Sequence, residues 1–139
     1  ELCLKKGRYE LTADAFAKVT EKSWVYADRV QKSPSQPNVW QTATILLESD
    51  GETPIRIGMK TSHPESEGEL IFGFDNFVLR RLPIVGDAND DGEISLLDVE
   101  YLLEVILGKA ERTPGCYVNT DDEVTISDLS ALIDLLQGR

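Results

Sequence analysis

The amino-acid sequence predicts an α+β protein of two domains. The first is an antiparallel β-sandwich or jelly roll over residues 1–82, which we expect to be incomplete, and the second is a small all-α pair of loop–helix units over residues 83–139. Short runs of β-forming residues separated by turn residues make up the first part. The second part contains one loop–helix pattern twice. Charge changes at the same place: residues 84–139 hold thirteen acidic and three basic residues, whereas residues 1–83 hold twelve and eleven.

The first part is predicted to contain five strands, at residues 9–16, 24–26, 40–48, 54–60 and 70–79. Segments 31–38 and 62–68 are rich in Ser, Pro, Gln and Glu and are predicted to be loops. Asp50-Gly51 lies between two of the strand runs and predicts a hairpin turn. No helical periodicity competes, so a sandwich or jelly roll is favoured.

Two segments of the second part, residues 87–98 and 117–128, place oxygen-bearing side chains at matching positions. In the first copy, positions 1, 3, 5, 9 and 12 are Asp87, Asn89, Asp91, Ser95 and Asp98. Position 6 is Gly92, which suits a backbone that must turn sharply. A hard cation such as Ca²⁺ takes six to eight oxygen ligands, and this spacing is the one that such a loop requires.

Each loop is followed by apolar residues at helical spacing, i, i+3, i+4 and i+7. These are Val99, Leu102, Leu103 and Ile106 in the first copy, and Leu129, Leu132, Ile133 and Leu136 in the second. Ser95 and Thr125 each precede an aspartate by three residues, which favours a capping box at the helix start. Gly108 and Gly138 favour the helix ends. We expect the two apolar faces to be buried against each other.

A duplicated half EF-hand of this kind resembles the type I dockerin family, over about residues 85–138. Pro83 stands where an entering helix would run, which agrees with the half motif. The resemblance implies side-chain calcium ligands at Asp87, Asn89, Asp91 and Asp98, a backbone carbonyl ligand at Glu93, and Ser95 acting directly or through water. The alternative is an acidic loop that caps a helix without metal.

The second copy departs from the family pattern at two positions. Tyr117 occupies position 1, where no carboxylate is available, and Asp122 occupies position 6, where glycine is expected. We expect a weaker second calcium site, or else a metal-free loop plugged by the Tyr117 ring. The ligands of the weaker site would be Asn119, Asp121, Glu123, Thr125 and Asp128.

Dockerins bind cohesin modules through exposed helix surface, with loop positions 10 and 11 prominent. Here these positions are Leu96, Leu97, Ile126 and Ser127. The resemblance therefore implies a docking module for a cohesin-like partner, with a more apolar contact than in some relatives. In the alternative, these residues pack against the β-domain, and the whole chain is a calcium-stabilised, lectin-like sugar-binding protein in which the second part is an internal brace.

Four segments of the first part resemble the latter half of galactose-binding-like jelly rolls found beside bacterial glycan-degrading enzymes. They are Gly7–Ala15, Trp40–Thr44, Ile57–Met59 and Phe74–Leu79. The resemblance implies a secreted bacterial protein of polysaccharide degradation, located outside the cell or on its surface. Trp24, Tyr26 and Trp40 are candidates for stacking on a sugar ring. For Trp40 and Trp24, a place in the core is favoured over stacking.

The chain is not expected to be an enzyme. His63 is the only histidine, with no second histidine or nearby cysteine to bind zinc or activate a nucleophile. Glu65, Glu67 and Glu69 alternate beside it, where a solvated charge run is favoured over the carboxylate pair of a glycosidase.

The net charge of −11 argues against nucleic acid and anionic membranes as partners. No run of eighteen apolar residues exists, so no membrane insertion is expected. Cys3 and Cys116 are the only cysteines. In an exported protein they would be able to pair and join the two parts, or they remain two separate small apolar residues.

Overall fold

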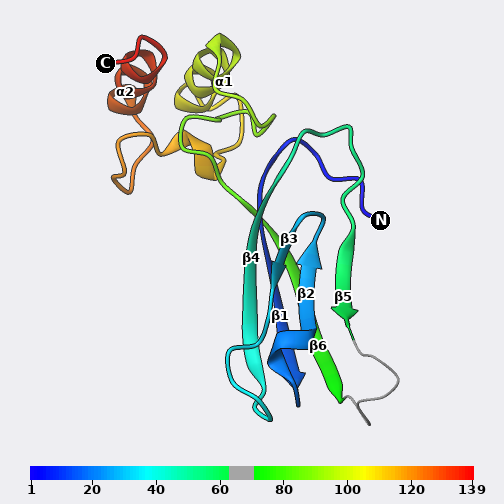
Figure 1. Ribbon diagram of the computed structural model, residues 1–139. Helices are drawn as coiled ribbons and strands as arrows, with labels where there is room; N and C mark the ends of the chain where they lie inside the picture. The colour runs from blue at the N-terminus through cyan, green and yellow to red at the C-terminus, as the bar shows by residue number, and fades with distance from the viewer. Residues whose placement is uncertain (63–70) are drawn as a thin grey trace. The chain divides into compact units, whose positions relative to one another are not determined.

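The computed structural model describes residues 1–62 and 71–139, and divides the chain into two compact units (Figure 1). The β unit comprises residues 1–4 and 8–81, and the helical unit comprises residues 5–7 and 82–139. His63, Glu65, Glu67, Glu69 and most of the predicted loop at 62–68 lie outside the described residues. Each unit has its own cluster of buried apolar side chains.

The β unit contains two antiparallel sheets of three strands. One sheet has the order β4-β1-β6, formed by Gln41–Ser49, Gly7–Ala17 and Phe72–Leu82. The other has the order β3-β2-β5, formed by Val30–Lys32, Ser23–Ala27 and Ile57–Thr61. Buried residues from both sheets share one core: Tyr9, Leu11, Ala13, Ala15, Val25, Ala27, Ala43, Ile45, Leu47 and Ile55. Predominantly antiparallel β-structure is therefore confirmed for the first part of the chain.

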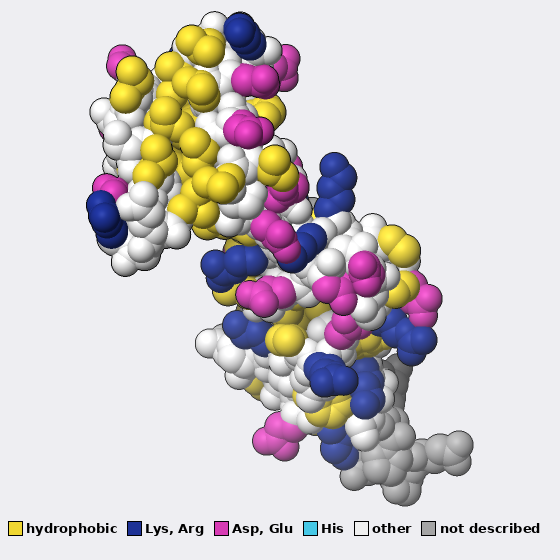
Figure 2. Space-filling view, turned by 90° about the horizontal axis from the view of Figure 1, so that it is seen from above, with side chains coloured by type: hydrophobic (Ala, Val, Ile, Leu, Met, Phe, Trp, Pro, Cys, Tyr) yellow, Lys and Arg dark blue, Asp and Glu magenta, His cyan; other side chains and the backbone are white. Residues whose placement is uncertain are grey.

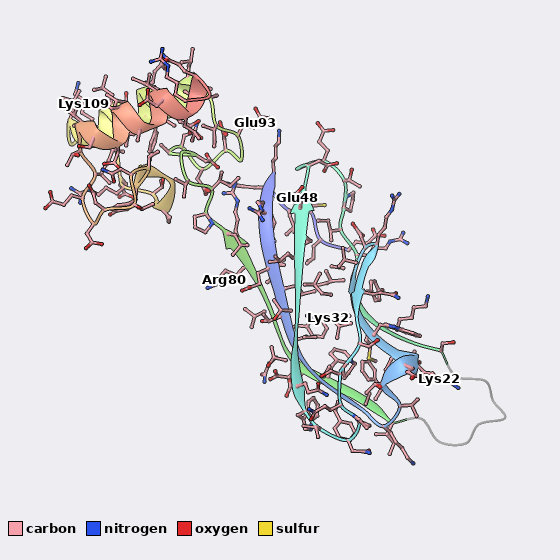
Figure 3. The ribbon with its side chains drawn as sticks, turned by 60° about the vertical axis from the view of Figure 1, so that its left-hand side comes forward. Lys22, Lys32, Glu48, Arg80, Glu93 and Lys109 are labelled. Carbon is pink, nitrogen blue, oxygen red and sulfur yellow. The ribbon has the colours of Figure 1, made fainter. Side chains whose placement is uncertain are left out.

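Burial alternates strictly from residue to residue along β1, so its sheet has a buried face and an outer face. Tyr9, Leu11, Ala13 and Ala15 are buried, whereas the residues between them are only partly buried. Successive side chains of a strand point to opposite faces, so the residues between them lie on the outer face. There Arg80 of β6 pairs with Glu10 at 2.8 Å, and Arg8 pairs with Glu48 of β4 at 3.9 Å. Figure 3 labels Arg80 and Glu48 on the two edge strands.

Three local expectations for the β unit were wrong. The short strand β3 occupies the start of the predicted loop at 31–38, because Val30 to Lys32 pair with Ala27 to Val25. Trp40 is exposed rather than part of the core. Asp50-Gly51 does not form a hairpin, since β4 and β5 belong to different sheets. After the turn, Ile55 bridges to Leu2 and its side chain is buried, which carries the chain across to the second sheet.

The helical unit contains α1 (Leu96–Ile106) and α2 (Ile126–Leu136), with a short 3-10 turn at Pro114–Cys116 between them. Both predicted capping boxes are present, with Ser95 and Thr125 as the caps. Gly108 and Gly138 follow the helices with φ of +72° and +71°, as expected for helix ends. Within residues 1–62 and 71–139, no helix is long and apolar enough to cross a membrane.

The predicted burial of the helix faces was only partly right. Leu102 and Leu132 are fully buried, but Leu103 and Ile133 are exposed, and the unpredicted Val105 is buried instead. The difference arises because the buried capping aspartates fix which side of each helix is buried. Asp98 and Asp128 are fully buried and held by loop N–H groups. A residue four positions later lies on the same face, so the buried stripe passes through Leu102 and Leu132.

Candidate metal centre

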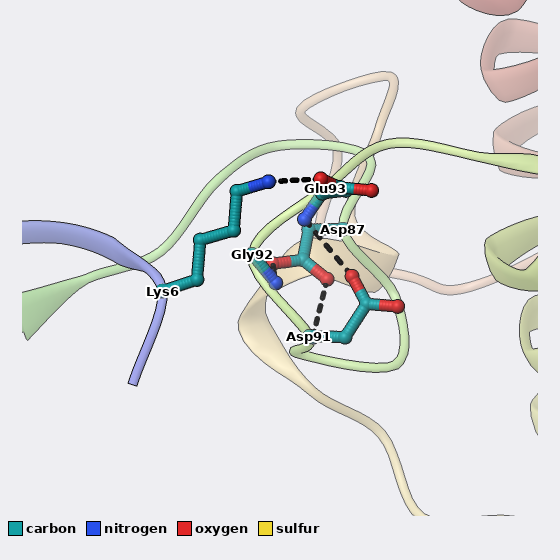
Figure 4. A network of polar contacts seen from close by, with 5 residues as sticks. All are labelled: Lys6, Asp87, Asp91, Gly92 and Glu93. Atoms are coloured by element: carbon teal, nitrogen blue, oxygen red, sulfur yellow. Dashed lines mark hydrogen bonds and ion pairs between the residues drawn. The ribbon is translucent and has the colours of Figure 1, made fainter. Parts of the chain in front are cut away.

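Asp87 organises the first loop from its first position. Its carboxylate is buried, and it accepts hydrogen bonds from the backbone N–H of Asp91 to Oδ1 and of Gly92 to Oδ2, both at 2.9 Å (Figure 4). These bonds fold the chain around the carboxylate. Asp90 and Gly92 adopt positive φ, +60° and +95°, in the same segment.

The other oxygen-bearing side chains of the loop accept hydrogen bonds from backbone N–H groups. Asp91 N donates to Asn89 Oδ1 at 3.0 Å, and Glu93 N donates to Asp91 Oδ1 at 2.9 Å. Asp98 closes the loop by accepting from Asn89 N at 3.1 Å and from Ser95 N at 2.8 Å. Side chains at positions 1, 3, 5 and 12 are thus tied into one loop by hydrogen bonds.

Two predicted ligand residues use their side chains elsewhere. The Ser95 hydroxyl accepts from Leu97 N at 3.1 Å as the helix cap. The Glu93 carboxylate forms an ion pair with Lys6 and raises the pKa of that lysine, chiefly through their hydrogen bond (Figure 4). The backbone-carbonyl role that the resemblance implied for Glu93 does not need this carboxylate.

Gly92 is required for two reasons. Its φ of +95° is strained for any residue with a side chain. In addition, a Cβ at this position would lie 2.5 Å from the Lys6 carbonyl oxygen. The first reason was visible in the sequence, whereas the second depends on a contact with a segment far away in the chain.

The electrostatics of the loop favour a cation. Burial raises the pKa of Asp87, and the charges of Asp98 and Asp91 raise it further, while the hydrogen bonds from Gly92 and Asp91 oppose the rise. A bound cation would relieve both the burial cost and the mutual repulsion of these carboxylates. The donors are all oxygens, which fits Ca²⁺. Across the described residues, no three His, Cys, Asp or Glu side chains gather into a group that could hold a metal ion.

The second loop repeats this framework without its first position. Val118 N and Asn119 N donate to Asp128 Oδ1, and Thr125 N donates to Asp128 Oδ2 at 2.9 Å. Asp121 N donates to Asn119 Oδ1 at 3.0 Å and Glu123 N to Asp121 Oδ1 at 2.9 Å, as in the first copy. Tyr117 has no carboxylate to replace Asp87, and its side chain packs against the apolar cluster of the unit.

The backbone of the second loop also differs at position 6. Thr120 has a φ of +65°, which matches Asp90, but Asp122 is not among the residues with positive φ. The positive φ of Gly92 therefore has no counterpart at Asp122. Both differences are reasons to expect weaker calcium binding by this loop.

The sequence did not reveal a close contact between residues 86–88 of the first copy and residues 113–116 of the second, which we call the seam. Gly86 N donates to Gly115 O at 3.0 Å, and the Thr113 hydroxyl donates to Ala88 O at 2.8 Å. A Cβ on Gly115 would lie only 1.9 Å from the Asp87 carbonyl oxygen. The one available signal was the small pair Gly115-Cys116, which aligns with Val85-Gly86 of the first copy. Cys116 is buried in this seam, Cys3 is exposed, and both are free cysteines.

The predicted partner residues are exposed where the helices begin. The exposed fractions are 74% for Leu96, 59% for Leu97 and 69% for Ile126, and Ser127 is also exposed. An open depression at the start of α2 is lined by Ile106, Val124, Thr125, Ile126, Ser127 and Ser130. Figure 2 shows hydrophobic side chains gathered on one face of the helical unit.

Two of the predicted sugar-stacking residues lie on β2. Trp24 and Tyr26 are partly buried and share one face of the strand, opposite Lys60 and Gly58 of β5. A Cβ on Gly58 would lie 3.2 Å from the Tyr26 hydroxyl oxygen, so the Tyr26 ring covers that glycine. The structure therefore brings these two residues together on one strand.

No protein-family model, no curated protein and no solved structure matches this chain.

Proposed function

We propose that the helical unit is a calcium-binding docking module of the dockerin type and that it anchors a secreted, glycan-active protein to a cohesin-like partner. In this proposal the β unit is a non-catalytic, carbohydrate-binding-like jelly roll. The observation that carries the proposal is the exposure of Leu96, Leu97 and Ile126 directly after the two loops. Large apolar side chains exposed at the start of each helix are typical of protein interfaces.

Calcium would act through the loops rather than at the interface itself. Asp87, Asn89, Asp91 and Asp98 would hold the ion in the first loop, with the Glu93 carbonyl and with Ser95 directly or through water. Asp98 also belongs to the capping box of α1. Ion binding would thereby stabilise the helix start on which Leu96 and Leu97 stand.

The proposal is tested with immobilised cohesin modules of several types, in Ca²⁺ and in EDTA. We expect at least one cohesin to bind the whole chain in Ca²⁺ and to release it in EDTA. Leu96→Glu with Leu97→Lys should abolish that binding and leave calcium affinity nearly unchanged, because neither side chain is a ligand. Val30→Glu, at an exposed valine of β3 in the β unit, is the control and should still bind.

The internal-brace alternative has a different outcome. If Leu96 and Leu97 were packed in a stable interface within the chain, the double variant would lose about 2 kcal/mol or more of unfolding free energy, as for the loss of a buried leucine. That loss, without any cohesin binding by the unmodified chain, would favour the brace and contradict docking.

A further inference from the structure

An exposed tryptophan stands at one end of the outer face of sheet β4-β1-β6. Trp40 directly precedes β4, and 56% of its surface is exposed. Its ring contacts Phe16 of β1, with ring centroids 5.8 Å apart and an angle of 42° between the planes. Phe16 lies on the face opposite to the buried Ala15 and Ala17, so the pair belongs to the outer face.

The Trp40 ring also lies against Gly73 of β6. A Cβ at Gly73 would lie 3.3 Å from Trp40 Cη2 and 3.6 Å from Cζ2. The φ of Gly73 is not in the left-handed region, so the backbone does not require a glycine there. The missing side chain instead leaves room for the Trp40 ring to lie over the neighbouring strand. Phe16 and Gly73 together hold an aromatic ring that is more than half exposed.

A polar cluster lies two residues further along the same face. Asp14 of β1 accepts from the Thr42 hydroxyl to Oδ1 at 2.7 Å and from Asn76 Nδ2 to Oδ2 at 2.8 Å. These hydrogen bonds join all three strands, and they lower the pKa of Asp14. Two residues of a strand span about 7 Å, so a ligand on the ring would reach the cluster. A carboxylate has about four acceptor sites, which leaves acceptor capacity for ligand hydroxyl groups.

We propose that Trp40, Phe16 and the Asp14–Thr42–Asn76 cluster form a binding site for a neutral pyranose chain. An aromatic face suits the apolar C–H face of a pyranose ring, while fixed polar groups beside it orient the hydroxyls. Asp14 is ionised at neutral pH and would repel uronic or sulfated sugars, so the ligand class is uncharged. This inference rests on the glycan-associated role proposed for the β unit, but not on calcium-dependent docking.

The test is affinity electrophoresis of the whole chain in gels that contain mixed-linkage β-glucan, galactomannan, xylan or polygalacturonate. We expect at least one neutral polysaccharide to retard the protein and polygalacturonate not to do so. Trp40→Ala should weaken that binding by about tenfold or more. Gly73→Ala should weaken it less, because it only displaces the ring. Val30→Ala, at an exposed valine of β3, is the surface control and should bind normally.

Two further measurements distinguish the loss of a sugar contact at Trp40 from a loss of folding and from an effect of calcium. Circular dichroism should give Trp40→Ala the same thermal unfolding as the unmodified chain, since an exposed ring contributes little to the core. Binding should also persist in EDTA, so a failure of the docking proposal leaves this result unaffected. The proposal is overturned if no neutral polysaccharide retards the chain, or if retardation is lost in Trp24→Ala and kept in Trp40→Ala, which would place the ligand at Trp24 and Tyr26.

Discussion

At the scale of single residues, short polar contacts decide local conformation and charge. Asp50 closes the turn after β4 by accepting from Glu52 N at 2.9 Å and from Thr53 N and the Thr53 hydroxyl, both at 2.7 Å. These bonds, with that of the Thr53 hydroxyl foremost, lower the pKa of Asp50 from 3.8 to about 2. A lowered carboxyl pKa stabilises the folded state above the unfolded pKa. That contribution is lost as the pH falls from about 4 through about 2.

The first prediction concerns this carboxyl group. Thr53→Val removes the hydroxyl donor and should raise the pKa of Asp50 towards its ordinary value. The pKa is measured by following the side-chain carboxyl carbon of Asp50 by NMR during an acid titration. Thr61→Val, at an exposed threonine of β5, is the matched control and should leave the pKa of Asp50 unchanged. An unaltered Asp50 titration in Thr53→Val would contradict the assignment of the hydroxyl bond as the main cause.

A second prediction concerns space at Gly115. Gly115→Ala would place a Cβ against the Asp87 backbone, which cannot move aside as a flexible side chain would. We expect it to destabilise the helical unit by about 3 kcal/mol, the upper range for overpacking. Gly108→Ala meets nothing within 4 Å and should cost only about 1 kcal/mol, through its positive φ. Urea unfolding of both variants measures the difference, and equal losses would show that the seam is not tightly packed.

At the scale of elements, the two loop–helix copies show how one framework tolerates different loop chemistry. Both helices have the same capping geometry, and both capping aspartates are buried. The copies differ at position 1, where Asp87 folds the loop and Tyr117 packs into the apolar cluster. The caps are alike in both copies, whereas we expect any capacity for an ion to depend on positions 1 and 6.

The third prediction follows from that difference. Calorimetric titration of the unmodified chain with Ca²⁺ should give one tight site and at most one weak site. Tyr117→Asp with Asp122→Gly restores a carboxylate at position 1 and a free backbone at position 6, and should create or strengthen the second site. The metal-free form of this variant should be somewhat less stable, because the Tyr117 ring no longer packs against the cluster. Two equal sites in the unmodified chain would contradict the prediction.

At the scale of the whole molecule, the chain consists of two units with separate cores. Most of the net charge of −11 lies on the helical unit, since residues 84–139 carry a net charge of −10. Calcium binding should therefore act on one unit and not on the other. Separate cores also allow the two units to unfold as separate cooperative transitions.

The fourth prediction tests that independence. Calorimetric scans in Ca²⁺ and in EDTA should show two transitions, of which only that of the helical unit shifts. An ion bound only by the folded state stabilises it by mass action, about 2.7 kcal/mol at a hundred times the dissociation constant. Asp87→Ala should remove most of the shift, whereas Glu104→Ala removes an exposed charge of the same sign from α1 and should keep it. A single transition, or one unaffected by EDTA, would falsify the calcium assignment of the first loop.

The sequence by itself was sufficient for features set by residues close together in the chain. The loop pattern from Asp87 to Asp98, the capping boxes at Ser95 and Thr125 and the ends at Gly108 and Gly138 depend on hydrogen bonds and backbone angles within a dozen residues. The run of β-forming residues at 9–16 likewise predicted the position of β1. Such signals survive in the sequence because both partners of each interaction stand at a short, fixed spacing.

Only the tertiary structure decided features that depend on distant partners. The turn at Asp50 leads to a different sheet because Ile55 meets Leu2, and the exposure of Trp40 depends on the space above Gly73. The close approach of Asp87 to Gly115 joins two copies of a repeat that the sequence presents as separate. Contacts of this kind depend on which segments the packed core brings together, and no local spacing of residues encodes them.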